Sequence, residues 1–166
     1  MKYADLVTHS YHPVKHITTG EGGAIFTNHA SIDKKIKLLR SHGVTREAGQ
    51  MISNDGPWYY EMQELGYNYR ITDFQCSLGL TQLKKLNKFL KKRREIAKIY
   101  NNEFIEDDRF VIPKTSKNIN HSYHLYPLLI KFKKLKIKKK ELFKKMAKKK
   151  INLQVHYIPI HLQPFY

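Results

Sequence analysis

Apolar side chains cluster in short runs at the start of the chain and recur at helical spacing further on. Runs of apolar residues predict strands over residues 3–10 and 23–27, joined by an irregular turn. Apolar positions within residues 32–39 then repeat with the period of a helix. Ser31 is the predicted N-cap of that helix, and Gly43 is its predicted stop.

The later part of the chain predicts one long helix followed by a smaller mixed region. Thr72 is a suitable N-cap, and the apolar face continues over residues 72–104, either unbroken or with a bend or break. An unbroken helix of this length would span roughly 50 Å, which suits a connector between two domains. Beyond it the pattern predicts a strand over residues 122–132, a helix over 138–150 and a strand over 151–160.

Residues 44–60 show no clear period and contain a strong turn signal at Asn54–Pro57, followed by three aromatic residues. One interpretation is a loop that aromatic packing holds in place. The other is a lid or a subunit contact over a ligand.

Charge widens the choice of partners. The net charge of +17 favours nucleic acid or an anionic surface. Residues 131–150 hold twelve lysines and one acid, Glu141, and the helix predicted there is amphipathic and basic, as in membrane-surface helices. We interpret most of this charge as solvated faces and the apolar stripe of the helix as packing on a small sheet, so we expect neither nucleic acid nor membrane as a partner.

Other bulk features point to a cytoplasmic protein. The chain has no apolar run near 18 residues and no signal-peptide pattern after its first residues. Cys76 is the sole cysteine, which excludes an internal disulfide and fits a reducing compartment. Its position in the long helix predicts a buried, inert thiol.

Candidate chemistry centres on the stretch Ser10–Gly23. Ser10 and Lys15 lie five residues apart with a proline between them, and three glycines follow. Burial disfavours the charged form of an amine, and a neutral amine can attack a carbonyl to form a Schiff base. The serine hydroxyl can hold a phosphate, and glycines let the backbone approach a ligand closely. The alternative is a solvated lysine on an ordinary turn.

Two further stretches carry polar candidates. Asn68 can donate a hydrogen bond to an anion, and Arg70 can bind a carboxylate or phosphate bidentately, although a plain surface arginine fits equally. His156 and His161 lie five residues apart near the end of the chain. They make a weak metal site because no acidic or cysteine partner has ligand spacing.

The run from Ser10 to Gly23 resembles the active-site signature of the DegT/StrS-type sugar aminotransferases, which use pyridoxal 5′-phosphate (PLP). The resemblance implies that Lys15 carries PLP covalently and that Ser10 contacts its phosphate. Residues 64–75 are a second match, in which the family's asparagine, here Asn68, reaches the PLP phosphate of the other subunit.

The same second match places Tyr69 and Arg70 near the cofactor or the nucleotide sugar. A third match, over residues 152–164, makes His156, Tyr157 and His161 substrate-side candidates. All three matches follow family order and together extend from about Ala4 to the last residue.

The resemblance implies an α/β fold, a fragment of the fold-type I PLP-dependent transferase fold. Residues 1–88 correspond to the end of the large domain and the start of the long helix, and residues 89–166 to a truncated α+β small domain. Family members form homodimers. The sequence of the run Ser10–Gly23 is most similar to that of enzymes of the pseudaminic acid pathway. These enzymes move an amino group, commonly from glutamate, to C4 of a UDP-linked 4-keto-6-deoxy-N-acetylhexosamine.

The chain departs from the family in length. The N-terminal half, which carries the aspartate partner of the PLP pyridine nitrogen, has no counterpart here, and the end of the small domain also has none. Three hypotheses stay open: an aminotransferase or part of one that is inactive alone, a basic module for nucleic acid or anionic membrane, and an inert fragment.

Overall fold

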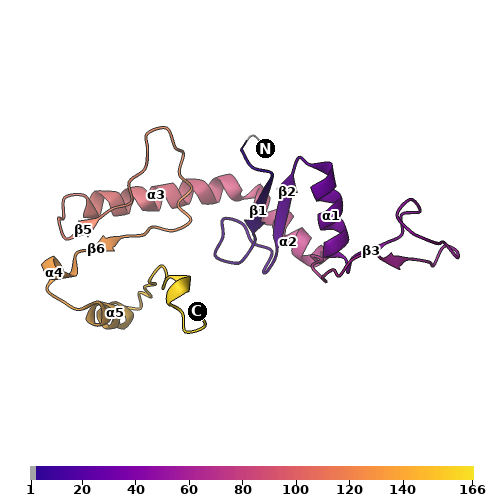
Figure 1. Cartoon of the computed structure of the whole chain (residues 1–166). Coiled ribbons are helices and arrows are strands. Elements are labelled where there is room, and N and C mark those ends of the chain that lie inside the picture. The colour runs from indigo at the N-terminus through magenta and orange to yellow at the C-terminus, as the bar shows by residue number, and fades with distance from the viewer. Residues whose placement is uncertain (1–2) are drawn as a thin grey trace. The chain divides into compact units, whose positions relative to one another are not determined.

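The computed structural model describes residues 3–166 (Figure 1), and packing divides the chain into two compact units. The first unit ends at Asn87 and the second begins at Lys88. Each unit is built around its own helices and short antiparallel strand pairs.

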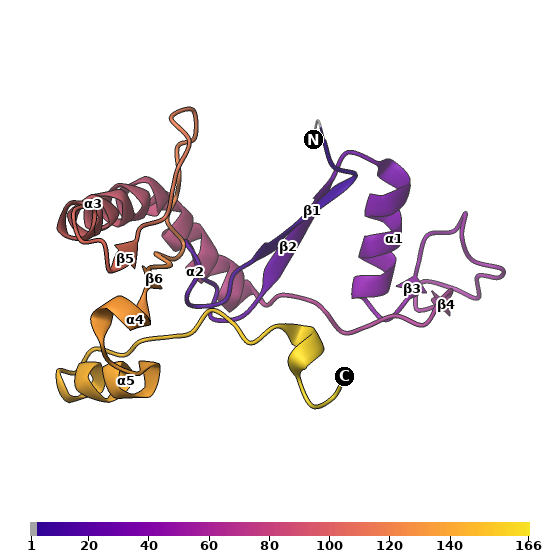
Figure 2. The same ribbon diagram turned by 60° about the vertical axis from the view of Figure 1, so that its left-hand side comes forward.

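The first unit opens with an antiparallel ribbon. β1 (Leu6–Ser10) pairs with β2 (Gly23–Thr27), and the register sets Leu6 opposite Thr27 and Ser10 opposite Gly23. Both strands fall where the apolar runs predict them. Figure 2 shows the two strands as a twisted ribbon, and the segment between them, residues 11–22, forms the turn at its end.

α1 (Ala30–Arg40) follows the ribbon and packs against β2. The N-cap is His29 and not Ser31, so that prediction was wrong. The reason is local: the Thr27 hydroxyl accepts a hydrogen bond from the His29 N–H (3.1 Å), and the His29 carbonyl accepts one from the Asp33 N–H (3.0 Å), so the first helical turn starts earlier.

Two glycines let the backbone after α1 cross the backbone before α2. The His42 N–H donates to the Tyr67 carbonyl at 2.8 Å across this crossing. A Cβ on Gly66 would lie 2.1 Å from the Gly43 nitrogen, and a Cβ on Gly43 would lie 1.8 Å from the Glu64 carbonyl oxygen. Gly43 also has φ +67°, so it provides both the predicted helix stop and the close approach.

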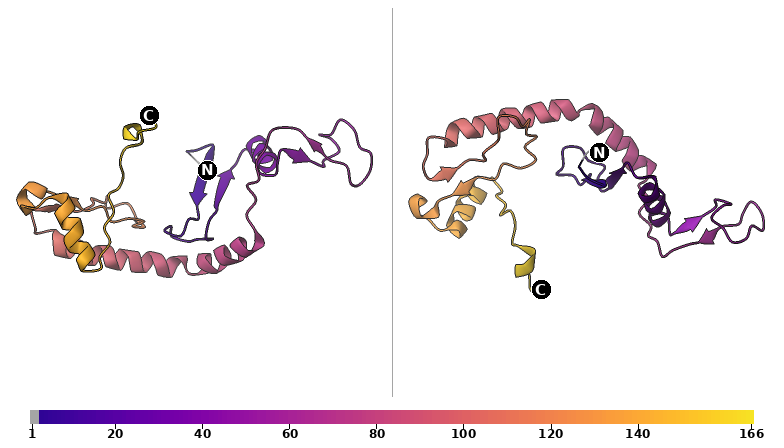
Figure 3. Two further views of the ribbon diagram at one scale, coloured as in Figure 1. Left: turned by 90° about the horizontal axis from the view of Figure 1, so that it is seen from below. Right: turned by 45° about the horizontal axis from the view of Figure 1, so that its top comes forward.

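Beyond the crossing, β3 (Val44–Thr45) pairs with β4 (Glu61–Met62) in antiparallel fashion. Residues 46–60 form the loop that connects β3 to β4 (Figure 3). The irregular loop is as expected from the sequence, but the strand pair that closes it was not predicted, because two residues are too few to show a period.

The predicted long helix is broken. α2 (Asp73–Lys84) begins at the predicted N-cap, Thr72, and ends where the Lys85 N–H donates to the Gln82 carbonyl at 2.9 Å. α3 (Leu86–Phe104) then begins.

In the second unit, α3 is joined by short elements. β5 (Phe110–Val111) pairs with β6 (Leu129–Ile130), and α4 (Phe132–Leu135), α5 (Lys139–Lys148) and the 3₁₀ turn η1 (Ile160–Leu162) follow. α5 confirms the helix predicted over residues 138–150.

Arginines on α3 hold the segment that precedes β6. Arg93 donates to the carbonyls of Tyr123 and His124, both at 3.1 Å, and Arg94 donates to the His121 carbonyl at 3.0 Å. The strand predicted over residues 122–132 is therefore wrong except for β6. The carbonyls before β6 accept hydrogen bonds from arginine side chains and not from a neighbouring strand.

The strand predicted over residues 151–160 is also wrong. Within residues 3–166 this segment pairs with no other strand, and its end turns into η1. An extended apolar segment becomes a strand only when a second backbone supplies hydrogen bonds.

Burial is sparse across the described residues. Ala97 is the one buried apolar side chain among them, and Thr19 and Thr45 are the buried polar ones. On α2, Phe74 is 91% exposed, and Cys76 is exposed too, so the prediction of a buried thiol was wrong. The α2 side that faces Thr19 is covered, whereas the sides that bear Phe74 and Cys76 are not.

No helix among residues 3–166 has the length and the apolar composition needed to cross a membrane.

We predict that Gly66→Ala destabilises the first unit by about 1–3 kcal/mol, because the new methyl group would overlap the backbone of residues 42 and 43. Gly49→Ala is the matched control, since nothing lies within 4 Å of a Cβ at that position, and it should change stability by less than about 0.5 kcal/mol. Urea unfolding of the two variants measures the difference. Equal effects would contradict the tight crossing.

Candidate active site

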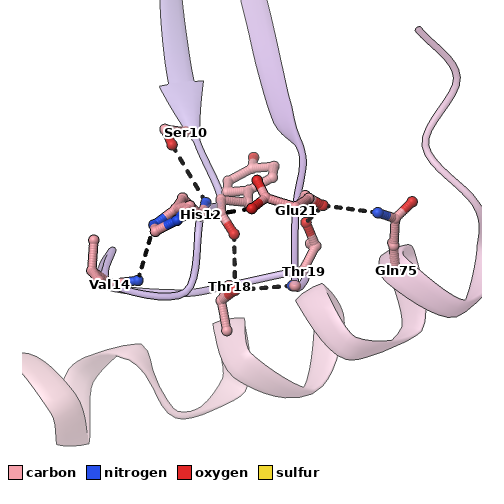
Figure 4. Close-up of polar contacts among 9 residues, drawn as sticks. Ser10, His12, Val14, Thr18, Thr19, Glu21 and Gln75 are labelled. Carbon is pink, nitrogen blue, oxygen red and sulfur yellow. Dashed lines mark hydrogen bonds and ion pairs between the residues drawn. The ribbon is translucent and has the colours of Figure 1, made fainter. Parts of the chain in front are cut away.

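The turn that carries Lys15 continues the β1–β2 ladder and then closes on itself. The Tyr11 N–H donates to the Gly22 carbonyl at 2.8 Å, which extends the ladder by one rung. The Tyr11 carbonyl accepts the Thr19 N–H at 3.1 Å and the Thr18 hydroxyl at 2.8 Å. These bonds bring the two ends of the turn together, and Figure 4 shows the side-chain contacts within the turn.

His12 connects the two residues that the signature singles out. Its N–H donates to the Ser10 hydroxyl oxygen at 3.4 Å, and its carbonyl accepts the Lys15 N–H at 2.9 Å. Its Nδ1 accepts the Val14 N–H at 3.5 Å. Lys15 is half-buried, and Ser10 is exposed at the end of β1. The structure thus places both on one hydrogen-bonded turn.

Thr19 is the most buried polar residue of the turn, at 4% exposure. Its hydroxyl donates to the Glu21 carbonyl at 2.6 Å. A Cβ on Gly22, whose φ is +141°, would lie 2.6 Å from that hydroxyl, and a Cβ on Gly79 of α2 would lie 2.9 Å from the Thr19 methyl group. Glycine at both positions lets the turn lie directly on the helix.

Gln75 ties the turn to the start of α2. Its side-chain oxygen accepts the Thr72 N–H at 2.9 Å, and the Thr72 hydroxyl accepts the Gln75 N–H at 3.3 Å, which together make a capping box. The Gln75 amide nitrogen donates to the Glu21 carbonyl at 3.0 Å. Figure 4 shows this bond between the helix and the turn. The first and second sequence matches therefore touch each other.

The loop before α2 presents the second group of predicted residues. Asn68 and Ser41 form an isolated antiparallel β-bridge, and the Tyr69 N–H donates to the Arg40 carbonyl at 3.0 Å. The rings of Tyr67 and Tyr69 stack at 4.8 Å. Asn68, Tyr69 and Arg70 all have exposed side chains on this fixed backbone, so they are accessible to a ligand.

The third group lies in the second unit. His156, Tyr157 and His161 are exposed, and the His156 and Tyr157 rings lie 4.1 Å apart. Their assignment to the substrate side stays a prediction.

Neighbouring carboxylates in the second unit do not converge. Asp107 pairs with Arg109, whose hydrogen bonds lower the pKa of Asp107 to about 2, and Asp108 pairs with Lys134. The described residues contain no group of three or more His, Cys, Asp and Glu side chains placed to hold a metal ion.

Glu61 organises the loop of residues 46–60. Its carboxylate accepts the N–H groups of Ile52 (2.7 Å) and Ser53 (2.9 Å), as well as the Tyr59 hydroxyl at 3.1 Å. The bonds from Ser53 and Ile52 lower the pKa of Glu61. The loop is thus held by the Glu61 carboxylate, whereas Trp58 and Tyr60, two of the three aromatic residues suggested to hold it, are exposed.

Comparison with known proteins settles the family. Residues 2–166 match the DegT/DnrJ/EryC1/StrS aminotransferase family. The chain belongs to this family. It is similar to the UDP-4-amino-4,6-dideoxy-N-acetyl-beta-L-altrosamine transaminase of Campylobacter jejuni, with 44% identity over 99% of this chain and 42% of that protein. It is also similar to the spore coat polysaccharide biosynthesis protein SpsC of Bacillus subtilis, with 34% identity over 98% and 42%.

Solved structures of aminotransferases share the fold. Helicobacter pylori PseC, an aminotransferase involved in the biosynthesis of pseudoaminic acid, superimposes with a TM-score of 0.85 at 35% identity, over 99% of this chain and 42% of that one. A putative sugar aminotransferase from Streptococcus pneumoniae in its PLP form gives 0.82 at 27% identity, over 98% and 40%. The expected α/β fold of the PLP-dependent sugar aminotransferases is confirmed, and this chain spans about 42% of the relatives' length.

Sequence reasoning missed two residues that position the turn, Thr19 and Gln75. A signal for Gln75 was available, because a threonine followed three residues later by glutamine is the pattern of a capping box. Nothing in the sequence signals the burial of Thr19, because that follows from the glycines that approach it, Gly22 within the turn and Gly79 on α2.

We predict that the loop of residues 46–60 loosens in acid. The pKa of Glu61 is lowered, so its stabilising effect is present above the usual carboxyl pKa of about 4.3 and is lost as the pH falls through the lowered value. Hydrogen exchange at the Ile52 and Ser53 amides, corrected for the intrinsic rate, measures this. Glu61→Gln should remove the pH step and leave exchange at the Gln63 amide, which donates to Gly43, unchanged. The same step in Glu61→Gln would contradict the assignment.

Proposed function

We propose that the chain is the Lys15-bearing part of a PLP-dependent sugar aminotransferase. The observation that carries this proposal is the half-buried Lys15 on a turn that hydrogen bonds to α2, in a chain that matches the family over residues 2–166. A solvated lysine on an ordinary turn would need neither the buried Thr19 nor the bond from Gln75.

The residues present fit PLP. Lys15 offers an amine for the aldehyde of PLP, and Ser10 offers an exposed hydroxyl at the end of β1 for a phosphate oxygen. Gly22, where a Cβ would collide with Thr19, keeps the backbone beside them free of side chains. Asn68, exposed on the loop before α2, is proposed to donate to the phosphate bound by a partner subunit.

In the proposed reaction PLP supplies an electron sink that stabilises negative charge next to the transferred nitrogen. Lys15 holds the cofactor before an amino donor arrives. When it is not bonded to the cofactor, its amine would serve as the base for the 1,3-proton shift of the amino transfer. Ser10 and Asn68 would hold the phosphate and so orient the cofactor toward the Lys15 amine.

We further propose the substrate class. The amine acceptor is a UDP-linked 4-keto-6-deoxy-N-acetylhexosamine, aminated at C4, and glutamate is the amino donor. The name of the Campylobacter jejuni relative, an altrosamine transaminase acting on a UDP sugar, supports this assignment. Tyr69 and Arg70 are proposed to bind the nucleotide sugar. His156, Tyr157 and His161 of the second unit are separate candidates for the substrate side.

Activity is proposed to need more polypeptide than these 166 residues. The chain covers 42% of its relatives, and α2 exposes apolar side chains on opposite sides, among them Phe74 (91%) and Leu83 (53%). A helix that is apolar all round is normally buried on every side. We propose that the remainder of the family fold and a second subunit cover it, with residues 1–88 in the large domain and 89–166 in the small domain.

We predict that PLP attaches covalently to Lys15 when the chain is assembled with a polypeptide that carries the remainder of the family fold. Borohydride trapping followed by peptide mass mapping should locate the modification at Lys15, and Lys15→Ala should abolish it together with the visible absorption band. Lys114→Ala, at an exposed lysine in the second unit, is the control that should change neither. Labelling of Lys15 no stronger than that of exposed lysines would overturn the proposed function.

A further inference from the structure

The Glu21 carbonyl is where the Lys15 turn and α2 meet. It accepts the Thr19 hydroxyl at 2.6 Å from within the turn and the Gln75 amide at 3.0 Å from α2. A carbonyl oxygen has two lone pairs, and both are used here by side chains. The turn that holds Lys15 is thus bonded to the helix through this backbone atom.

The contact on the helix side extends over one full helical turn. Gln75 and Gly79 are four residues apart and therefore lie on the same face of α2. Gln75 donates to the turn, and Gly79 receives the methyl group of Thr19 so closely that a Cβ there would lie 2.9 Å from it. One polar and one steric contact together fix how the turn lies on α2.

We propose that Gln75 is a positioning residue that holds the Lys15 turn against the start of α2. This role requires a side chain that accepts one hydrogen bond and donates another. The amide oxygen accepts the Thr72 N–H at 2.9 Å while the amide nitrogen donates to Glu21. A glutamate completes a capping box but has no donor when ionised, and a lysine donates but cannot accept. The ordering of the turn is independent of PLP, whereas its consequence for Lys15 rests on the proposed function.

Two substitutions separate the two ends of this side chain. Gln75→Glu keeps the acceptor for the Thr72 N–H and removes the donor to Glu21. Thr72→Ala removes the hydroxyl that caps α2 and keeps the Gln75 bond to the turn. Helix content by circular dichroism verifies that both variants fold as the unchanged chain does.

Hydrogen exchange at the Tyr11 and Thr19 amides, which donate to Gly22 and Tyr11 respectively, reports on the turn. We expect Gln75→Glu to speed exchange there about tenfold, as loss of one hydrogen bond allows, and Thr72→Ala to change it by less than about twofold. The Gln63 amide, which donates to Gly43, is the internal reference and should be unchanged in both. Unchanged exchange at Tyr11 and Thr19 in Gln75→Glu, or an equal effect of both variants, would overturn the proposal.

A second readout tests the effect on Lys15 in the assembly that holds PLP. Gln75→Glu should shift the pH dependence of the visible absorption band, because the amine would no longer be held in one direction, while Thr72→Ala should leave that pH dependence in place. An unshifted profile together with faster exchange would limit Gln75 to ordering the turn and would overturn its role toward Lys15. Absence of any band in the unsubstituted assembly would count against the proposed function, and the exchange result would still decide the role of Gln75.

Discussion

The bond from the Gln75 side chain to the Glu21 carbonyl joins the Lys15 turn to α2. With Ala97 as the one buried apolar side chain among residues 3–166, apolar packing contributes little to the order of the Lys15 turn. Order comes instead from hydrogen bonds that close on each other: Gln75 to Glu21, Thr19 to Glu21, and Tyr11 to Gly22. Because these bonds join the β1–β2 ribbon to the start of α2, the two stretches that carry the cofactor chemistry in our proposal are parts of one local structure.

Glycine pairs complete that structure by allowing close contacts. Gly22 and Gly79 admit the Thr19 side chain from two sides, and Gly43 and Gly66 let the segments around residues 42 and 66 cross. A methyl group at Gly43 or Gly66 would collide with backbone atoms, and one at Gly22 or Gly79 would collide with the Thr19 side chain. The loop that bears Asn68 and Arg70 is therefore placed by close backbone contacts, which keeps their side chains free for a ligand.

The sequence correctly predicted the elements that depend on the spacing of neighbouring residues. The strands around the Lys15 turn, the Thr72 cap and the helix near residues 139–148 are all present, because each depends on neighbours within a few residues. The predictions that failed depend on distant partners. Residues 122–128 lose their strand because arginines of α3 bind their carbonyls, and residues 151–160 pair with no strand within the described chain. Cys76 is exposed because only the Thr19 side of α2 is covered.

Most of the positive charge of this chain is lysine, and two of its arginines make more than one hydrogen bond each to a fixed set of acceptors. Arg93 donates from Nη1 to two carbonyls, and Arg109 donates from Nε and Nη2 to both oxygens of Asp107. An ammonium group is a compact point charge and cannot reproduce the fork that Arg109 makes. In our proposal the exposed Arg70 can offer the same fork of donors to a nucleotide sugar.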